Sequence, residues 1–144
     1  MKRLLHIITA LALVTSSLLA AEGVEAGPRR GRILKLEGSK AEFFVEKDRK
    51  ISIAFYDDAK KQQAPGDQVI TATAEAPSGK KRIEFEKKGD LLVSKEPLPE
   101  GEGYNIVVQA KEKADAKPKN FRIKLDMSVC KKCDNPEYAC TCDE

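Results

Sequence analysis

Alternation of apolar and polar side chains is the main pattern of the chain after residue 40. Over residues 41–47, Ala41, Phe43 and Val45 fall on one face of an extended segment. Residues 51–57 repeat the alternation after a short polar stretch. A period of two residues is typical of half-buried strands, and a tight polar connection between two such strands indicates an antiparallel hairpin. The pattern therefore predicts a β-hairpin over residues 41–57.

Further short segments of β-branched or alternating residues follow, separated by Gly, Pro and charged residues. The segment 104–110 is the most apolar of them and is predicted to be a central strand. No stretch shows the apolar spacing of an amphipathic helix of two turns or more. The other predicted strands cover residues 32–36, 68–74, 80–87, 91–94 and 120–129.

Seven or eight short strands in roughly 100 residues predict an all-β fold. We expect an immunoglobulin-like or fibronectin-like antiparallel β-sandwich, with a small barrel as the alternative. No cysteine lies before residue 130, so the two sheets cannot be joined by a disulfide. The core is therefore expected to hold by burial of apolar side chains alone.

The first 26 residues have the pattern of a secretory signal peptide. A short basic start at Lys2 and Arg3 precedes an almost wholly apolar run from Leu4 to Ala21, and small residues follow. The candidate cleavage positions are after Ala20, Ala21 or Ala26. An uncleaved membrane anchor is the alternative, since the run is about long enough to span a bilayer.

This pattern predicts a periplasmic or extracellular protein. The predicted organisation is a signal peptide at 1–26, a β-sandwich domain at 27–129 and a cysteine-rich tail at 130–144. No later stretch is long and apolar enough to cross a membrane as a helix.

Composition excludes several kinds of chemistry. The only histidine, His6, lies in the predicted signal peptide, so the processed chain would have neither Ser-His-Asp nor Cys-His catalysis nor a histidine metal ligand. Attachment of c-type haem is excluded because Cys133 is followed by Asp134. The net charge is +3, and the charges are mixed without a basic stripe that alternates with aromatics, so nucleic-acid binding is not expected. The chain is predicted not to be an enzyme.

The tail carries the one arrangement of residues that indicates a site. Its spacing is C-x2-C-x6-C-x-C, and four thiolates around one ion form a typical structural Zn²⁺ site. Thiolates also suit Cu(I). Two neighbouring lysines, Lys131 and Lys132, would offset part of the negative charge and favour the thiolate form. The predicted ligands of Zn²⁺ or Cu(I) are Cys130, Cys133, Cys140 and Cys142.

Two disulfides are the alternative, because export leads to an oxidising compartment. Four cysteines allow three connectivities, and pairing between the two halves of the tail is favoured because a bond within C-x-C would be strained. The protein would then be an interaction module that docks on an envelope partner. A thiol–disulfide oxidoreductase is a third hypothesis, which lacks the helix N-terminus expected behind a C-x2-C motif.

Two other groups of side chains bear on binding. Tyr138 lies between the cysteine pairs and is expected to pin the tail against the sandwich. Acidic residues near one loop raise the question of Ca²⁺, but the Asp-x-Asp-x-Asp-Gly pattern is absent. They are predicted to form a solvated rim; the residues are Glu42, Glu46, Asp48, Asp57 and Asp58.

The stretch Ala41-Glu42-Phe43-Phe44-Val45, residues 51–57, and the tail from Glu137 to Cys142 resemble a family of uncharacterised small secreted bacterial β-sandwich proteins. Those proteins end in C-x2-C followed by Glu-Tyr-Ala-Cys-x-Cys. More distantly, the first stretch is similar to β-domains of periplasmic adaptor subunits of heavy-metal efflux pumps. Such relatives often carry histidine before this stretch, where this chain has Ser39 and Lys40. The resemblance implies a metal-linked envelope protein whose partner is an envelope or efflux protein.

Overall fold

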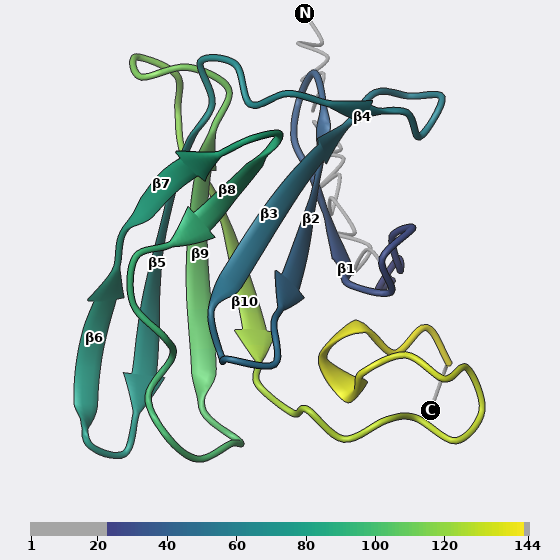
Figure 1. Ribbon diagram of the computed structural model, residues 1–144, viewed down its shortest axis with the longest axis vertical. Coiled ribbons are helices and arrows are strands. Elements are labelled where there is room, and N and C mark those ends of the chain that lie inside the picture. Colours follow the sequence, from purple (N-terminus) through teal and green to yellow (C-terminus); the bar gives the residue numbers. More distant parts are fainter. Residues whose placement is uncertain (1–22, 143–144) are drawn as a thin grey trace, which may run out of the picture.

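Two antiparallel β-sheets stack face to face in the computed structural model, which describes residues 23–142 (Figure 1). The prediction of an all-β sandwich is confirmed. The predicted signal peptide lies outside the described residues except for its last four positions. Among the described residues, no helix has the length and apolarity needed to cross a membrane.

The larger sheet has the strand order β1-β2-β3-β8-β7, and the short β4 also pairs with β3. The predicted hairpin over residues 41–57 is its β2–β3 pair, in which Phe43 lies opposite Ile53. The strands are β1 (Arg32–Lys35), β2 (Lys40–Val45), β3 (Ile51–Tyr56), β4 (Gln62–Gln63), β7 (Phe85–Lys88) and β8 (Leu91–Ser94).

The smaller sheet has the strand order β10-β9-β5-β6. The segment predicted to be a central strand, 104–110, corresponds to β9, which is paired on both sides by β10 and β5. That prediction is confirmed. The strands are β5 (Val69–Ala76), β6 (Gly79–Ile83), β9 (Asn105–Lys111) and β10 (Lys119–Lys124).

The predicted strand over residues 80–87 is two strands that belong to different sheets. β6 ends at Ile83 in the smaller sheet, and β7 begins at Phe85 in the larger one, so only Glu84 separates them. Periodicity shows which faces of a segment are apolar but not which sheet each half joins. This division and the two-residue β4 give ten strands among the described residues, where seven or eight were predicted.

The core lies between the two sheets. On the larger sheet, the apolar face predicted for residues 41–47 packs inward, with Ala41 and Phe43 fully buried. On the smaller sheet, every second residue of β5 and β9 is buried, together with Ile83 of β6 and Ile123 of β10. Each large side chain buried in this way contributes about 1.5–3 kcal/mol to stability. The largest fully buried apolar side chains are Leu34, Phe43, Ile51, Ile53, Phe55, Ile83, Ile106, Val108, Ile123 and Leu125.

Glu42 corrects the prediction of a solvated acidic rim, because its side chain is fully buried on the side of β2 away from the core. The loop before β1 folds over it, and the backbone N–H groups of Arg29 and Gly31 donate to its Oε1 at 2.9 and 2.7 Å. The Tyr56 hydroxyl donates to Oε2 at 2.8 Å. Desolvation and this bond raise the pKa of Tyr56 to about 12. The alternating pattern placed Glu42 on the correct face but could not show that another segment covers that face.

The same loop extends the sandwich before residue 27. The backbone N–H of Ile33 donates to the Glu25 carbonyl at 2.8 Å, and Ala26 pairs with Arg32. The Glu25 carboxylate also lies 3.6 Å from Lys35 Nζ. Residues 25 and 26, the last two of the predicted signal peptide, therefore pair with the edge of the larger sheet.

Candidate metal centre

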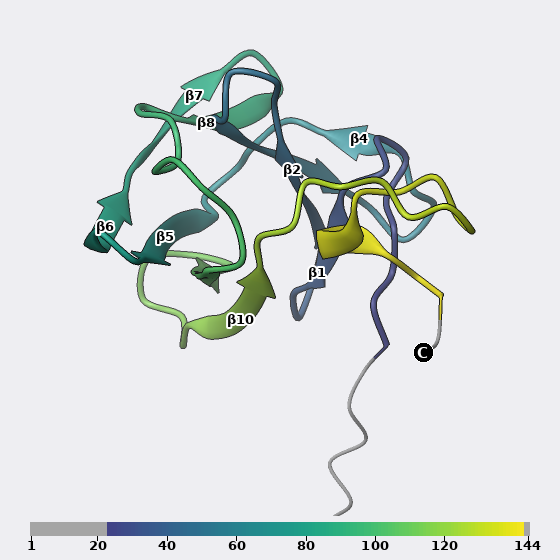
Figure 2. The ribbon, with the colours of Figure 1, turned by 90° about the horizontal axis from the view of Figure 1, so that it is seen from below.

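The tail after β10 folds back on itself and packs against the end of the sandwich next to β1 (Figure 2). Backbone hydrogen bonds join its outgoing and returning segments. Glu137 N–H donates to the Ser128 carbonyl at 2.8 Å, and Tyr138 N–H donates to the Asp126 carbonyl at 3.2 Å. Between these segments, residues 129 and 136 form an antiparallel bridge. The tail is therefore a closed loop with its own backbone bonding.

Tyr138 anchors this loop, as the sequence predicted. It lies in the short 3₁₀ helix η1 (Glu137–Ala139) and is only 3% exposed. Its ring meets that of Phe43 edge to face, with 5.7 Å between centroids, and the backbone N–H of Val45 donates to its hydroxyl at 3.1 Å. Burial raises the pKa of Tyr138. A single aromatic side chain thus connects the tail to the core of the sandwich.

A tight turn positions the first pair of cysteines. Asp134 N–H donates to the Cys130 carbonyl at 2.9 Å, and Cys130 N–H donates to the Asn135 carbonyl at 2.8 Å. The turn requires a left-handed backbone at Asp134, with φ of 58°, a conformation that Asp tolerates better than most residues. Arg30 Nη1 donates to the Asp134 carbonyl at 3.3 Å, which joins the turn to the loop before β1.

The second pair follows η1 directly. Cys140 N–H donates to the Glu137 carbonyl at 3.2 Å and closes the 3₁₀ turn. Cys140 itself is extended, with φ of −63° and ψ of 130°. In an extended segment, residues two positions apart point to the same side. The C-x-C spacing therefore lets Cys140 and Cys142 face the first pair together.

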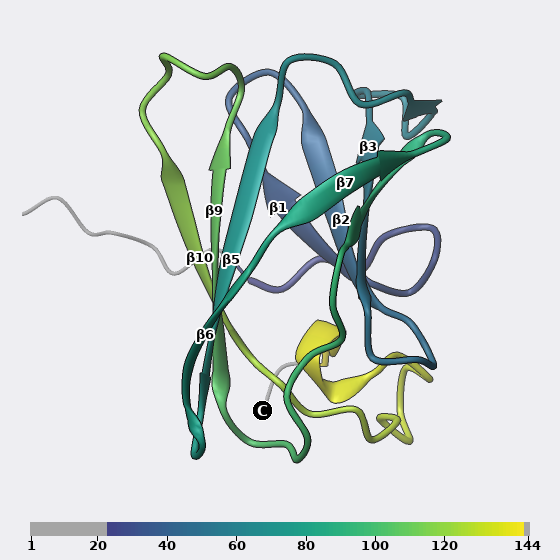
Figure 3. The same cartoon turned by 60° about the vertical axis from the view of Figure 1, so that its left-hand side comes forward.

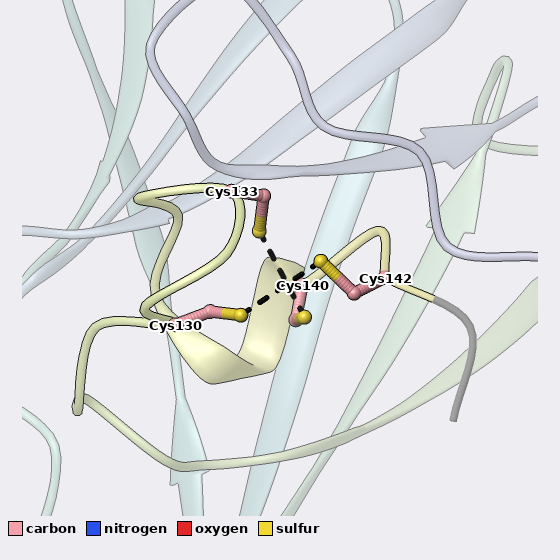
Figure 4. Close-up of side chains that lie close together, drawn as sticks. All are labelled: Cys130, Cys133, Cys140 and Cys142. Atoms are coloured by element: carbon pink, nitrogen blue, oxygen red, sulfur yellow. Dashed lines mark hydrogen bonds between the residues drawn. The ribbon is translucent and has the colours of Figure 1, made fainter.

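The four cysteine side chains point toward one another, so that their sulfur atoms cluster (Figure 4). All four lie within 4.8 Å of one another. Cys130 Sγ is 3.9 Å from Cys142 Sγ, and Cys133 Sγ is 3.8 Å from Cys140 Sγ. No disulfide joins them. The structure thus brings together every cysteine that the sequence singled out.

These separations match metal coordination better than disulfide bonding. Bonded sulfurs lie about 2.05 Å apart. Four thiolates at about 2.3 Å from a central Zn²⁺ form a tetrahedron whose edges are about 3.8 Å. Two of the sulfur–sulfur distances, 3.8 and 3.9 Å, agree with such an edge. The donor set and its spacing therefore fit one four-coordinate soft ion.

Backbone donors tune the thiols unequally. Hydrogen bonds from the backbone N–H groups of Thr141 and Asn135 lower the pKa of Cys133 to about 6. Desolvation and hydrogen bonds with the neighbouring thiols raise the pKa of Cys142 to about 12. The Cys133 thiol is therefore ionised near neutral pH, whereas the Cys142 thiol stays protonated there unless a cation lies beside it.

The site lies at the surface and opens onto a groove of about 750 Å³. Cys130 is buried, whereas the other three cysteines are partly exposed. The groove is lined on one side by Val129, which is 60% exposed. Lys131 and Lys132 also line it, but the pKa shifts of Cys133 and Cys142 come from backbone donors, burial and the neighbouring thiols rather than from these lysines.

Sequence reasoning found the four cysteines and Tyr138 but not the groups that support them. The backbone N–H donors of Asn135 and Thr141 carry no sequence signal, because any residue except proline supplies them. The acidic residues considered for Ca²⁺ do not converge; within residues 23–142 the cysteines are the only group of His, Cys, Asp or Glu found close enough to share an ion.

Comparisons with models of protein families, with curated proteins and with solved structures find no match to this chain.

Proposed function

We propose that this protein is an exported, non-enzymatic metal-binding protein that holds one Zn²⁺ or Cu(I) ion in its tail. The observation that carries the proposal is the convergence of four unlinked sulfurs within 4.8 Å of one another. Tetrahedral coordination by four sulfurs is typical of Zn²⁺, and thiolates also suit Cu(I). The ligands are Cys130, Cys133, Cys140 and Cys142.

The donor set favours binding over catalysis. A catalytic Zn²⁺ site keeps one coordination position for water or substrate, whereas four protein thiolates fill a tetrahedral shell. The ion would stabilise the tail and, through Tyr138, its contact with the sandwich. With export predicted from the first 26 residues, the setting is the cell envelope, where the protein would take part in metal handling beside an envelope or efflux partner.

The decisive measurement is the state of the sulfurs in protein isolated from the periplasm. Intact mass spectrometry and elemental analysis should give one equivalent of metal and, after chelation, four thiols that can be alkylated. Elemental analysis also separates zinc from copper. A mass lower by four hydrogens, with no metal, would show two disulfides and would contradict the proposal in favour of the interaction module.

Matched variants separate coordination from fold. Cys140→Ser removes one ligand and should abolish stable metal uptake. Thr141→Ser changes the exposed neighbour of the same cysteine and keeps the backbone N–H that bonds to Cys133, so metal uptake should stay unchanged. Equal metal content in the two variants would sink the four-cysteine site.

A further inference from the structure

The outer face of the smaller sheet is a basic surface that lies apart from the cysteine site. Strand register puts Lys124, Asn105, Glu75 and Lys80 in one row across the sheet, and Arg122, Val107, Thr73 and Arg82 in the next. These positions alternate with the buried core residues of the same strands, so they face away from the sandwich. Among residues 23–142, no strand or helix lies on the outer side of β10, β9, β5 and β6 (Figure 3).

Each of these two rows has a cation at both ends. Lys124 and Arg122 come from β10, and Lys80 and Arg82 come from β6; all four are exposed. The two outer strands are three strand spacings apart, about 14 Å, and successive rows on one face are about 7 Å apart. The four cations therefore stand at the corners of a broad rectangle. We define this rectangle, with Lys111 further along β9, as the basic face.

Within the two rows, cations outnumber carboxylates. Glu75 is the only acidic residue in the rows, and it pairs with Arg122 at 2.8 Å and with Lys80 at 3.5 Å. Neither Arg82 nor Lys124 forms a salt bridge with a described residue, although Arg82 helps to lower the pKa of nearby Glu84 and Lys124 that of nearby Asp126. As defined, the basic face has five cations against one carboxylate, with Glu84 and Asp126 at its edge; the net charge of the whole chain is +3.

We propose that the basic face docks on a membrane surface of anionic phospholipids. Cations spread over a broad sheet cannot converge on one small anion, but they match an array of lipid phosphates, which attracts each nearby Lys or Arg. The face presents Thr, Asn, Gln and Val between the cations and no aromatic side chain. It therefore lacks the stacking platforms that single-stranded nucleic acids require.

The proposal is tested with the processed, metal-loaded protein isolated from the periplasm. The probes are vesicles of phosphatidylcholine alone and of phosphatidylcholine with about one third phosphatidylglycerol, which supplies the anionic surface. We expect cosedimentation with the anionic vesicles at low ionic strength and release at high salt, because salt screens exposed charges. Absence of binding to anionic vesicles, or equal binding to both kinds, would overturn the proposal.

Two double variants with the same change in net charge locate the surface. Arg82→Glu with Lys124→Glu should weaken vesicle binding by about tenfold or more, because it reverses two unpaired cations of the basic face. Lys47→Glu with Lys61→Glu reverses two exposed lysines outside the smaller sheet and should keep binding within about twofold. Equal losses in both would show that net charge alone matters and would refute the assignment. Urea unfolding checks that all the variants fold.

This test is independent of the metal site. Cys140→Ser should bind anionic vesicles as the unchanged protein does, since the tail contributes no residue to the basic face. Loss of vesicle binding in that variant would contradict the proposal, whereas loss of its metal bears only on the cysteine site.

Discussion

The sandwich and the tail hold their shape by different means. Residues before 130 contain no cysteine, and their two sheets enclose a continuous apolar core. The tail contributes only Tyr138 and Ala139 to that core and gathers all four cysteines at its own centre. Burial of apolar area is sufficient for two packed sheets, whereas a loop of about a dozen residues has too little of it. The difference assigns stability to one region and the candidate metal site to the other.

The largest effect is expected from a change confined to the sandwich. Phe55→Ala empties a fully buried position on β3 and should lower the free energy of unfolding by about 3–5 kcal/mol. Urea denaturation measures this loss, and the protein that stays folded should keep its full metal content. Exposed Lys47→Ala is the control, with a change of about 0.5 kcal/mol or less. Metal lost from folded Phe55→Ala protein would show that the two regions are not separate.

A somewhat smaller loss is expected where the loop before β1 covers the larger sheet. Glu42→Leu leaves the N–H groups of Arg29 and Gly31 and the Tyr56 hydroxyl without their acceptor, at a cost of about 3 kcal/mol. Glu42→Gln keeps one oxygen as an acceptor and should cost less. Both are compared by urea denaturation. Equal stability of all three proteins would mean that these bonds do not hold the loop in place.

The contact between the two regions should be weaker still. Tyr138→Phe keeps the ring against Phe43 but removes the acceptor of the Val45 N–H, so unfolding should become easier by about 1 kcal/mol. Hydrogen exchange at the Val45 amide should accelerate, while the metal stays bound. An unchanged exchange rate at that amide would show that the tail detaches and reattaches faster than the bond protects it.

The mildest test changes no residue and concerns the tail alone. In reduced, metal-free protein, the pKa of Cys133 near 6 leaves this thiol mostly ionised at neutral pH. Its alkylation rate should therefore rise through about pH 6 and then level off, because the thiolate is the reactive form. Cys142, with its pKa raised to about 12, should react slowly throughout. Peptide mapping after short iodoacetamide pulses measures both rates, and equal rates would refute the unequal tuning.

The local structure of most of the sandwich follows from the sequence, because alternation reports which side of a strand is apolar. It predicted the β2–β3 hairpin and the interior position of β9. It could not separate β6 from β7, since Ile83 and Phe85 continue one alternation although their neighbours lie in different sheets. Only the pairing partners, which are distant in the sequence, distinguish the two strands.

Glu42 and the cysteines show the same limit at the level of side chains. Covering Glu42 requires close approach of residues 27–31, where a Cβ on Gly27 or Gly31 would collide with the Glu42 side chain or the Phe43 carbonyl. The glycines were visible in the sequence, but their target was not. Cysteine spacing likewise left metal and disulfides as alternatives, and it could not show that the four sulfurs converge without being bonded to one another.

The passage of the chain through Glu84 has a mechanical consequence. β6 and β7 are joined by this one residue, so the two layers of the sandwich share an almost unbroken length of backbone. One sheet cannot move or unfold separately without displacing the strand of the other sheet to which Glu84 joins it. The domain should therefore melt in one cooperative step, with a calorimetric enthalpy equal to the van't Hoff value.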